Sequence, residues 1–325
     1  MSEPGEWQVP AAARPKAEEV AFDLDRTLSS VVSLRAEIPE DAFTAGILGT
    51  EREGNGVVIG DDGLVLTIGY LITEAATVWL VSEQGTAAPA HVVGYDQKTG
   101  FGLVQALGRL DVPAMALGAS GGLKVGDEVI VAGQGGRRHA LKARVIAKRE
   151  FAGYWEYVLD EALFTAPAHP SWGGAALIGP DGRLLGIGSL LLQETRAEEP
   201  PQDANMFVPI DLFEAVRDDL LKFGKASGPA RPWLGIYTTE VDGTVHVAGL
   251  AEDAPADKAN LRVGDVVLAV GGAPVANLAD LFHRIWALGP AGTIVPLTVA
   301  RDGEELTIAV HSADRSDFLK APELQ

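Results

Sequence analysis

Residues 169–188, HPSWGGAALIGPDGRLLGIG, decide the fold class of this chain. The segment opens with a glycine-rich loop and continues into an apolar run at 175–178. A Gly-Pro-Asp-Gly turn at 179–182 then leads into a second apolar run. Glycine supplies the positive φ of such a turn without steric cost, so the two runs are predicted to pair as a β-hairpin.

This β pattern extends over most of the chain. From Ser29 to about Ile210, short runs rich in Val, Leu and Ile alternate with turns rich in Gly, Asp and Asn. Such regular spacing predicts a barrel or a sandwich. Residues 211–223 instead have apolar side chains at helical spacing, with Asp211 as the predicted N-cap and Gly224 as the stop.

The composition excludes several classes of function. The 325 residues carry a net charge of −19, so nucleic acid and acidic lipid surfaces are poor partners. Cysteine is absent, which rules out disulfides, thiolate zinc sites and cysteine nucleophiles. The six histidines include no pair at metal-ligand spacing, so neither a metal nor another cofactor is expected.

The sequence gives two indications about location. No apolar run approaches the roughly 20 residues needed to cross a bilayer. The first residues, MSEPGEW, contain neither the basic region nor the apolar region of a secretory signal, which predicts a cytoplasmic protein.

Further motifs precede residue 169 in a fixed order. They are GNGVVI at 54–59, VGYD at 93–96, LGAS at 117–120 and VGD at 125–127. Together with residues 169–188 they resemble the protease domain of the HtrA (DegP-like) family of serine proteases. The resemblance implies a mainly β fold with a chymotrypsin-like double β-barrel, and it makes the periplasm an alternative location.

A second unit follows a linker rich in Gly and Pro. RPWLGI at 231–236 and APADKANLRVGD at 254–265 resemble the PDZ domain of the same family, which implies a small α+β domain. Asn260 stands where that family has glycine, and asparagine is the side chain that best tolerates the left-handed region. The expected parts are listed in chain order: a flexible N-terminal arm at 1–24, a protease-fold domain at 25–224, a linker at 225–232, a PDZ-like domain at 233–312 and a tail at 313–325.

The resemblance also assigns the three catalytic positions. It puts Tyr70 in place of the histidine, Gly100 in place of the aspartate and Gly173 in place of the serine, with Trp172 as the alternative for the serine. None of these can replace the lost group, because a phenol is a poor base at neutral pH and glycine offers no carboxylate or hydroxyl. We therefore expect a degenerate peptidase site, partly filled by Tyr70 and Trp172.

A shifted nucleophile is the alternative reading of this site. Ser171 lies two residues from His169, so the pair resembles a nucleophile with its base. The simpler interpretation, which we favour, is a local turn hydrogen bond for Ser171 and an exposed loop position for His169.

The PDZ-like unit carries the second candidate site. PDZ domains bind an extended chain end, whose carboxylate accepts backbone N–H groups. Leu234, Gly235 and Ile236 match that carboxylate loop, and Leu278 and Phe282 belong to the helix expected to face the peptide. Most of the apolar stripe on this helix is predicted to be core.

These observations predict a catalytically inactive HtrA-like pseudoprotease that acts as a peptide- or protein-binding scaffold or regulator through its PDZ-like domain. The alternative is a serine endopeptidase of the HtrA family with a rearranged active site. The resemblance further implies a bacterial protein of protein quality control that forms a homotrimer or joins an active homologue.

Overall fold

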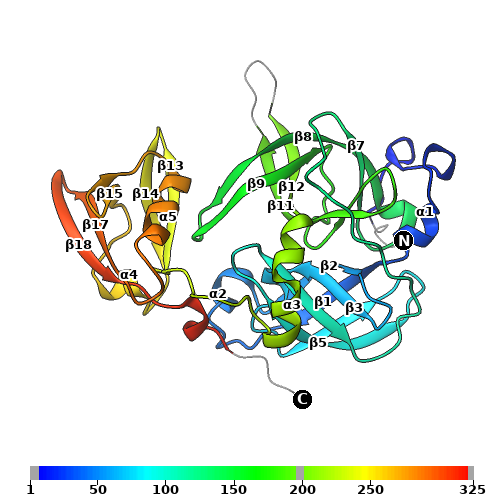
Figure 1. Ribbon diagram of the computed structural model, residues 1–325, viewed down its shortest axis with the longest axis horizontal. Coiled ribbons are helices and arrows are strands. Elements are labelled where there is room, and N and C mark those ends of the chain that lie inside the picture. The colour runs from blue at the N-terminus through cyan, green and yellow to red at the C-terminus, as the bar shows by residue number, and fades with distance from the viewer. Residues whose placement is uncertain (1–6, 195–200, 321–325) are drawn as a thin grey trace, which may run out of the picture. The chain divides into compact units, whose positions relative to one another are not determined.

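The protein is described by a computed structural model for residues 7–194 and 201–320. It divides into two compact units (Figure 1). The first comprises Met1–Arg149, Glu161–Ser227 and Lys320–Gln325, and the second comprises Glu150–Asp160 and Gly228–Leu319. The mainly β fold expected from the sequence is confirmed.

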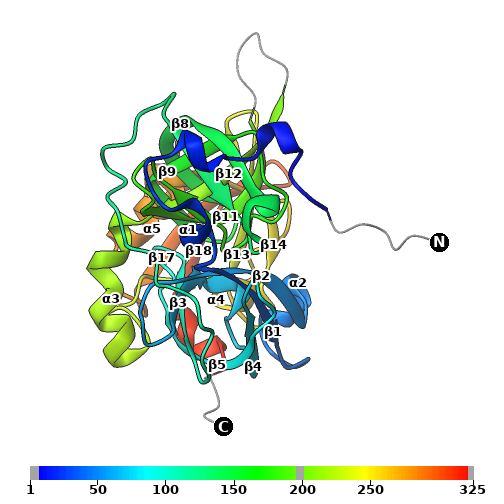
Figure 2. The ribbon, with the colours of Figure 1, turned by 90° about the vertical axis from the view of Figure 1, so that its right-hand side faces the viewer.

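The first unit contains two closed six-stranded barrels (Figures 1 and 2). Closure pairs every strand on both sides, which leaves no free sheet edge. The first barrel has the order β1-β2-β3-β6-β5-β4. Its strands are β1 (Val31–Glu37), β2 (Glu51–Val58), β3 (Leu64–Ile68), β4 (Thr77–Val81), β5 (Ala87–Tyr95) and β6 (Phe101–Ala106).

The second barrel has the order β10-β11-β12-β9-β8-β7. The hairpin predicted at 169–188 is confirmed, because β10 pairs antiparallel with β11 and Gly182 has φ 77° in the turn between them. Apolar side chains fill this barrel, among them Val131, Leu177 and Phe207, each with 0% exposure. Its strands are β7 (Glu128–Ala132), β8 (Ala140–Gly153), β9 (Tyr157–Ala166), β10 (Ala176–Ile178), β11 (Leu184–Glu194) and β12 (Gln202–Pro209).

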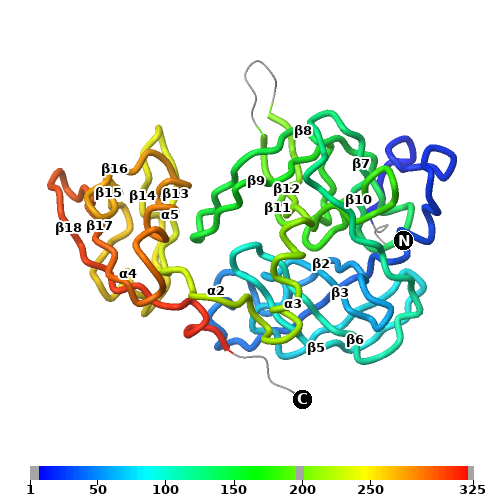
Figure 3. The backbone as a smooth tube through the Cα atoms, in the orientation of Figure 1, coloured from blue at the N-terminus to red at the C-terminus, as the bar shows by residue number. Residues whose placement is uncertain are grey.

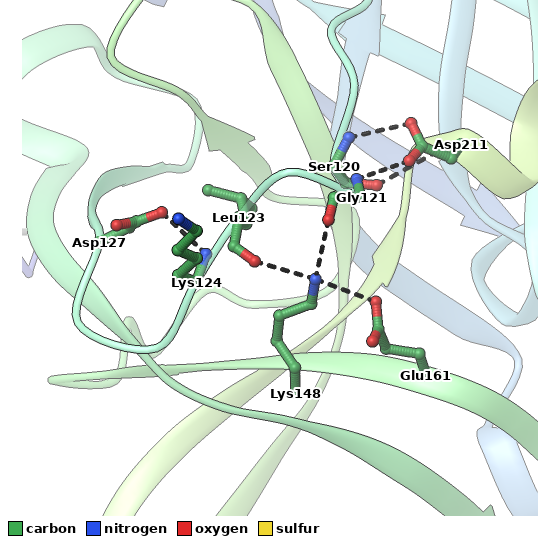
Figure 4. A network of polar contacts seen from close by, with 8 residues as sticks. All are labelled: Ser120, Gly121, Leu123, Lys124, Asp127, Lys148, Glu161 and Asp211. Atoms are coloured by element: carbon green, nitrogen blue, oxygen red, sulfur yellow. Dashed lines mark hydrogen bonds and ion pairs between the residues drawn. The ribbon is translucent and has the colours of Figure 1, made fainter.

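The helix predicted after β12 is present as α3 (Asp211–Phe223), and Gly224 ends it with φ 70°. The predicted N-cap is wrong by one residue, because Ile210 occupies that position and makes no side-chain bond. The Asp211 carboxylate instead accepts the backbone N–H groups of Ser120 (2.9 Å) and Gly121 (2.6 Å) (Figure 4). Asp211 therefore fastens the segment that joins the two barrels to the start of the helix.

Lys148 on β8 extends this network (Figure 4). Its ammonium group donates to the carbonyl oxygens of Leu123 (2.9 Å) and Gly121 (3.3 Å) and lies 3.1 Å from the Glu161 carboxylate. Only 14% of the Lys148 side chain is exposed, against 52% of the Glu161 side chain, so solvent reaches this ion pair mainly from the Glu161 side. The connecting segment is thus held from both sides.

Residues 7–24 of the expected flexible arm have defined contacts with the second barrel, which corrects that expectation. Val9 is fully buried, and its N–H donates to the Arg138 carbonyl oxygen at 2.8 Å. The Phe22 ring covers Gly182 so closely that a Cβ there would lie 2.6 Å from it. The sequence predicts flexibility because the arm is rich in Pro, Ala and Glu, and the two apolar residues that pack on the barrel, Val9 and Phe22, are isolated within it. Residues 1–6 lie outside the described residues.

Short helices complete the first unit. Arg137 and Asp25 form a two-point ion pair, at 2.5 and 2.6 Å, between the segment before β8 and the first α-helix. The helical segments are η1 (Ala11–Ala13), η2 (Ala17–Glu19), α1 (Leu24–Leu28), α2 (Ala45–Leu48), η3 (Gly69–Leu71) and η4 (Gly136–His139).

The second unit is a sheet in the order β13-β14-β15-β17-β18, with β16 paired to β15 (Figure 3). Asn260 has φ 61°, as expected for an asparagine that replaces glycine. The Asn277 side chain caps helix α5 by accepting the Asp280 N–H. The elements are β13 (Ile236–Val241), β14 (Thr244–Leu250), α4 (Pro255–Lys258), β15 (Val266–Val270), β16 (Ala273–Pro274), α5 (Leu278–Ala287), β17 (Ile294–Arg301), β18 (Glu304–His311) and η5 (Arg315–Phe318).

Two domain boundaries differ from the sequence prediction. Residues 150–160, at the turn of the β8–β9 hairpin, belong to the second unit, although the sequence assigned them to the protease-fold domain. The expected tail is ordered in part. Ala313 forms an antiparallel β-bridge with Trp233, and the Phe318 and Trp233 rings pack with 4.8 Å between their centroids. Residues 321–325 of that tail lie outside the described residues.

The bonds of Asp211 predict a measurable stability difference. Asp211→Ala removes both acceptors of the Ser120 and Gly121 N–H groups and should lower the free energy of unfolding by about 1–2 kcal/mol. Urea unfolding followed by circular dichroism measures this loss. Glu214→Ala, in the first turn of the same helix, is the matched control and should change stability by less than about 0.5 kcal/mol. Equal effects of both variants would contradict the role of Asp211.

Candidate functional site

The structure brings together the three positions that the resemblance assigns to a catalytic triad. Tyr70 lies in η3 directly after β3, Gly100 lies in the turn before β6 and Gly173 lies in the loop before β10. The Gly69 N–H donates to the Gly100 carbonyl oxygen at 2.7 Å, which puts Tyr70 beside Gly100. A Cβ on Gly173 would lie 2.8 Å from the Tyr70 hydroxyl oxygen.

Tyr70 is held in this place by two hydrogen bonds. Its hydroxyl donates to the Ser189 carbonyl oxygen at 2.9 Å and accepts a bond from the Trp172 side chain, whose indole N–H is a donor only. Burial raises the pKa of Tyr70 well above its usual value. A hydroxyl that keeps its proton so firmly cannot serve as a general base at neutral pH.

Asn55 on β2 organises the loop around Gly173. Its amide nitrogen donates to the carbonyl oxygens of Ser171 and Gly173 and to the Ser171 hydroxyl, each at 3.1 Å. Its side-chain amide oxygen accepts the backbone N–H of Gln134 at 2.9 Å. The backbone N–H of Asn55 donates to the Gly173 carbonyl oxygen at 2.8 Å. Asn55 is 3% exposed, so its amide is shielded from water even though its partner Ser171 is exposed.

His169 is buried, which corrects the expectation of an exposed loop residue. Its side chain lies beside the Trp7 ring, with 5.2 Å between ring centroids. Nε2 lies 3.1 Å from the His139 carbonyl oxygen and Nδ1 lies 3.1 Å from the Ser171 nitrogen. Since a carbonyl oxygen can only accept, the proton of the neutral ring is on Nε2. Burial lowers the pKa of His169 to about 4.

This arrangement decides what Ser171 can do. The His169 Nδ1 lone pair accepts the Ser171 backbone N–H, so it is not directed at the Ser171 hydroxyl. In trypsin-like peptidases the N–H two residues before the nucleophile also binds the oxyanion. Here that N–H belongs to Ser171 and is engaged by the imidazole. The Ser171 hydroxyl accepts from Asn55 across the two barrels, rather than forming only the local turn bond expected from the sequence.

The second candidate site is the loop before β13. Gly235 has φ 78°, and the N–H groups of Leu234, Gly235 and Ile236 all donate to the Glu156 carboxylate, with a shortest distance of 2.7 Å at Gly235. Glu156 is 5% exposed. Burial raises the pKa of Glu156 to about 7. The three N–H groups and the charge of Arg315 act in the opposite direction, because they favour the ionised carboxylate. The loop is therefore built to hold a carboxylate.

The apolar residues named for peptide binding take different positions. Leu234, Ile236 and Phe282 are at most 1% exposed and belong to the core of the second unit. Leu278 is partly buried at the edge of this core, and its N–H donates to the Glu240 carboxylate at 3.0 Å. At the loop, backbone groups therefore supply the recognition chemistry, while the side chains hold the loop in place.

Sequence reasoning missed two of the residues that shape these sites. Asn55 stands in the GNGVVI motif, where an amide between two glycines in an apolar strand is a signal for a polar contact. Glu156 gave no signal, because a single acidic residue in a hairpin turn normally faces solvent.

The comparisons with known proteins agree with this architecture. Residues 54–187 match the family model of the trypsin-like peptidase domain, and residues 232–311 match that of the PDZ domain. In the described parts of the chain, no helix is long and apolar enough to span a membrane, and His, Asp and Glu form no group of three that could hold a metal ion.

Curated relatives are bacterial proteins named "Probable periplasmic serine endoprotease DegP-like". The protein from Pseudomonas savastanoi pv. phaseolicola is 31% identical over 281 residues, covering 80% of this chain and 56% of the relative. The protein from Pseudomonas fulva is 29% identical over 290 residues, covering 84% and 59%. The chain thus spans less than three fifths of the length of these relatives.

Solved structures support the fold alone. The HtrA-type protease AlgW with a tripeptide has a TM-score of 0.53 at 20% identity, covering 92% of this chain and 97% of that one. The serine endoprotease from Yersinia pestis has a TM-score of 0.52 at 21% identity, covering 91% and 99%.

The contact between Tyr70 and Gly173 predicts a non-additive pair of substitutions. Gly173→Ala should push the Tyr70 hydroxyl away and lower the free energy of unfolding by about 1–3 kcal/mol. In a Tyr70→Phe background the same change should cost less, because the clashing oxygen is gone. Urea unfolding of the four proteins measures the coupling, and Gly122→Ala, at a site with open space, is the control. Strict additivity would contradict the contact.

The buried His169 predicts a pH-dependent stability. Its pKa is about 4 in the folded chain and near 6.5 when exposed, so the unfolded chain binds the proton first. Its stabilising contribution is complete above about pH 6.5, falls as the pH drops towards 4 and amounts to about 3 kcal/mol at most. Melting temperatures from pH 7.5 to 4 should fall more steeply for the wild type than for His169→Gln. Parallel curves would contradict this assignment.

Proposed function

Because this chain is a homologue of the DegP-like, HtrA-type serine endoproteases and joins a trypsin-like peptidase domain to a PDZ domain, we propose that it binds polypeptides without cleaving them. One observation carries the proposal. The Tyr70 hydroxyl occupies the space beside Gly173 where a nucleophile would need to project. No serine, histidine or aspartate stands at the three assigned positions.

Three further contacts support the loss of hydrolysis. His169 uses Nδ1 on a backbone N–H and has a lowered pKa, so it is poorly placed to take a proton from a hydroxyl. The Ser171 N–H is engaged where an oxyanion would need it. Asn55 fixes the loop in this conformation through its buried bonds. Each contact opposes a different requirement of acyl transfer.

Binding is assigned to the backbone N–H groups of Leu234, Gly235 and Ile236, with Leu278 at the partly buried edge of the neighbouring helix. Phe282 was also named for binding from the sequence, but it is fully buried and supports this helix from the core. The three N–H groups that converge on one carboxylate support a ligand with a free C-terminal carboxylate, taken up by strand addition beside β13. The chain would act as a scaffold or regulator in protein quality control, as a homo-oligomer or with an active homologue. The names of the relatives favour the periplasm over the cytoplasm expected from the first residues.

A serine endopeptidase with Ser171 as nucleophile is the second candidate. The observation in its favour is that the relatives are named serine endoproteases and that Ser171 is exposed. This candidate requires His169 to release the Ser171 N–H and turn Nδ1 towards the hydroxyl.

One experiment separates the two candidates. The purified full chain is treated with a fluorophosphonate probe and, separately, with unfolded casein, beside an active HtrA-type protease as positive control. We expect neither labelling nor cleavage above buffer, and no difference between the wild type and Ser171→Ala. Labelling or cleavage that disappears in Ser171→Ala would establish the endopeptidase and overturn the proposed function.

A further inference from the structure

The carboxylate loop of the PDZ unit is occupied by a residue of this chain. Glu156 lies in the turn between β8 and β9, within the 150–160 segment that belongs to the second unit. Its Oε1 accepts the N–H groups of Gly235 (2.7 Å) and Ile236 (3.1 Å), and Oε2 accepts that of Leu234 (3.1 Å). These are the donors that a peptide carboxylate would need.

The backbone of the same segment pairs with the strand that follows the loop. The Thr238 N–H on β13 donates to the Tyr154 carbonyl oxygen at 2.9 Å. Tyr154 precedes Glu156 by two residues, and Thr238 follows Ile236 by two. A peptide bound by strand addition makes these same two kinds of contact, with its carboxylate in the loop and an earlier carbonyl group on the strand. Residues 154–156 therefore reproduce both.

Apolar contacts hold the segment in this position. Val158 is 5% exposed within the core of the second unit, and Ala152 packs against that core. The Trp155 and Tyr157 rings stack at 5.6 Å, and the Tyr154 ring lies 6.2 Å from that of Tyr237 on β13. Glu156 has φ 60°, a left-handed conformation that is unfavourable for a non-glycine residue and persists where the surroundings stabilise it.

We propose that Glu156 acts as an internal ligand of the PDZ loop, so that a carboxylate-terminated peptide binds only after residues 154–156 leave it. This inference rests on the proposed function, because it concerns regulation of the same binding loop. The apparent affinity of a ligand is its intrinsic affinity multiplied by the fraction of molecules whose site is open. The wild type is therefore a weak binder that becomes a strong one when the segment is displaced.

The test measures peptide affinity on the full chain. The probe is a fluorescein-labelled pool of random hexapeptides with free C-terminal carboxylates, followed by fluorescence anisotropy, with the same pool amidated as a control for carboxylate recognition. Glu156→Ala removes the internal carboxylate and should bind the free-acid pool at least about tenfold more tightly than the wild type. Glu156→Gln keeps the size but not the charge and should give a smaller gain, which guards against a misfolded alanine variant. The amidated pool should bind no variant better than the wild type.

Asp160→Ala is the matched control, because Asp160 is an exposed carboxylate in the same hairpin and should leave the affinity unchanged. Equal binding of the free-acid pool by the wild type and both Glu156 variants would overturn the internal ligand and leave the proposed function intact. Absence of binding by every protein would overturn the proposed function, and the internal ligand with it. A gain in Asp160→Ala equal to that in Glu156→Ala would reduce the effect to net charge and also overturn the inference.

Discussion

The hydrogen bonds of the Asn55 side chain are the constraint on which the peptidase-like unit depends. The amide lies on β2 of the first barrel and bonds to two loops of the second, one after β7 and one before β10. The fit leaves no spare space, since a Cβ on Gly174 would lie 1.8 Å from the Asn55 carbonyl oxygen. These bonds and this close approach confine the loop from Ser171 to Gly174, with Gly173 beside the Tyr70 hydroxyl.

A shared feature links this loop to the PDZ unit. In both places, groups that the proposed function assigns to polypeptide recognition are bonded to other parts of the chain. The Ser171 N–H is held by His169, and the N–H groups of residues 234–236 are held by Glu156. A buried donor without an acceptor costs about 1–3 kcal/mol, so internal acceptors stabilise the chain in the absence of a ligand. A ligand must then compete with them.

The sequence predicted the fold well because its evidence is local and repeated. The hairpin at 169–188, the glycine that ends α3 and the left-handed Asn260 each follow from side-chain sterics within a few residues. The order of the motifs also predicted that Tyr70, Gly100 and Gly173 lie at one site.

The sequence prediction failed where interacting residues are distant in the chain. The burial of His169 depends on Trp7 and His139, and the role of Glu156 depends on residues about 80 positions further on. The prediction of Asp211 as N-cap was wrong for the same reason, because its carboxylate accepts the N–H groups of Ser120 and Gly121, about 90 residues earlier in the chain.

Hydrogen exchange of backbone amides in the full wild-type chain without ligand tests the central claim most directly, because it reports on both loops at once. If internal groups hold these donors, the N–H groups of Ser171, Leu234, Gly235 and Ile236 should exchange slowly, at rates close to those of the neighbouring strands. Rapid exchange at residues 234–236 or at Ser171, with the strands still protected, would contradict the account.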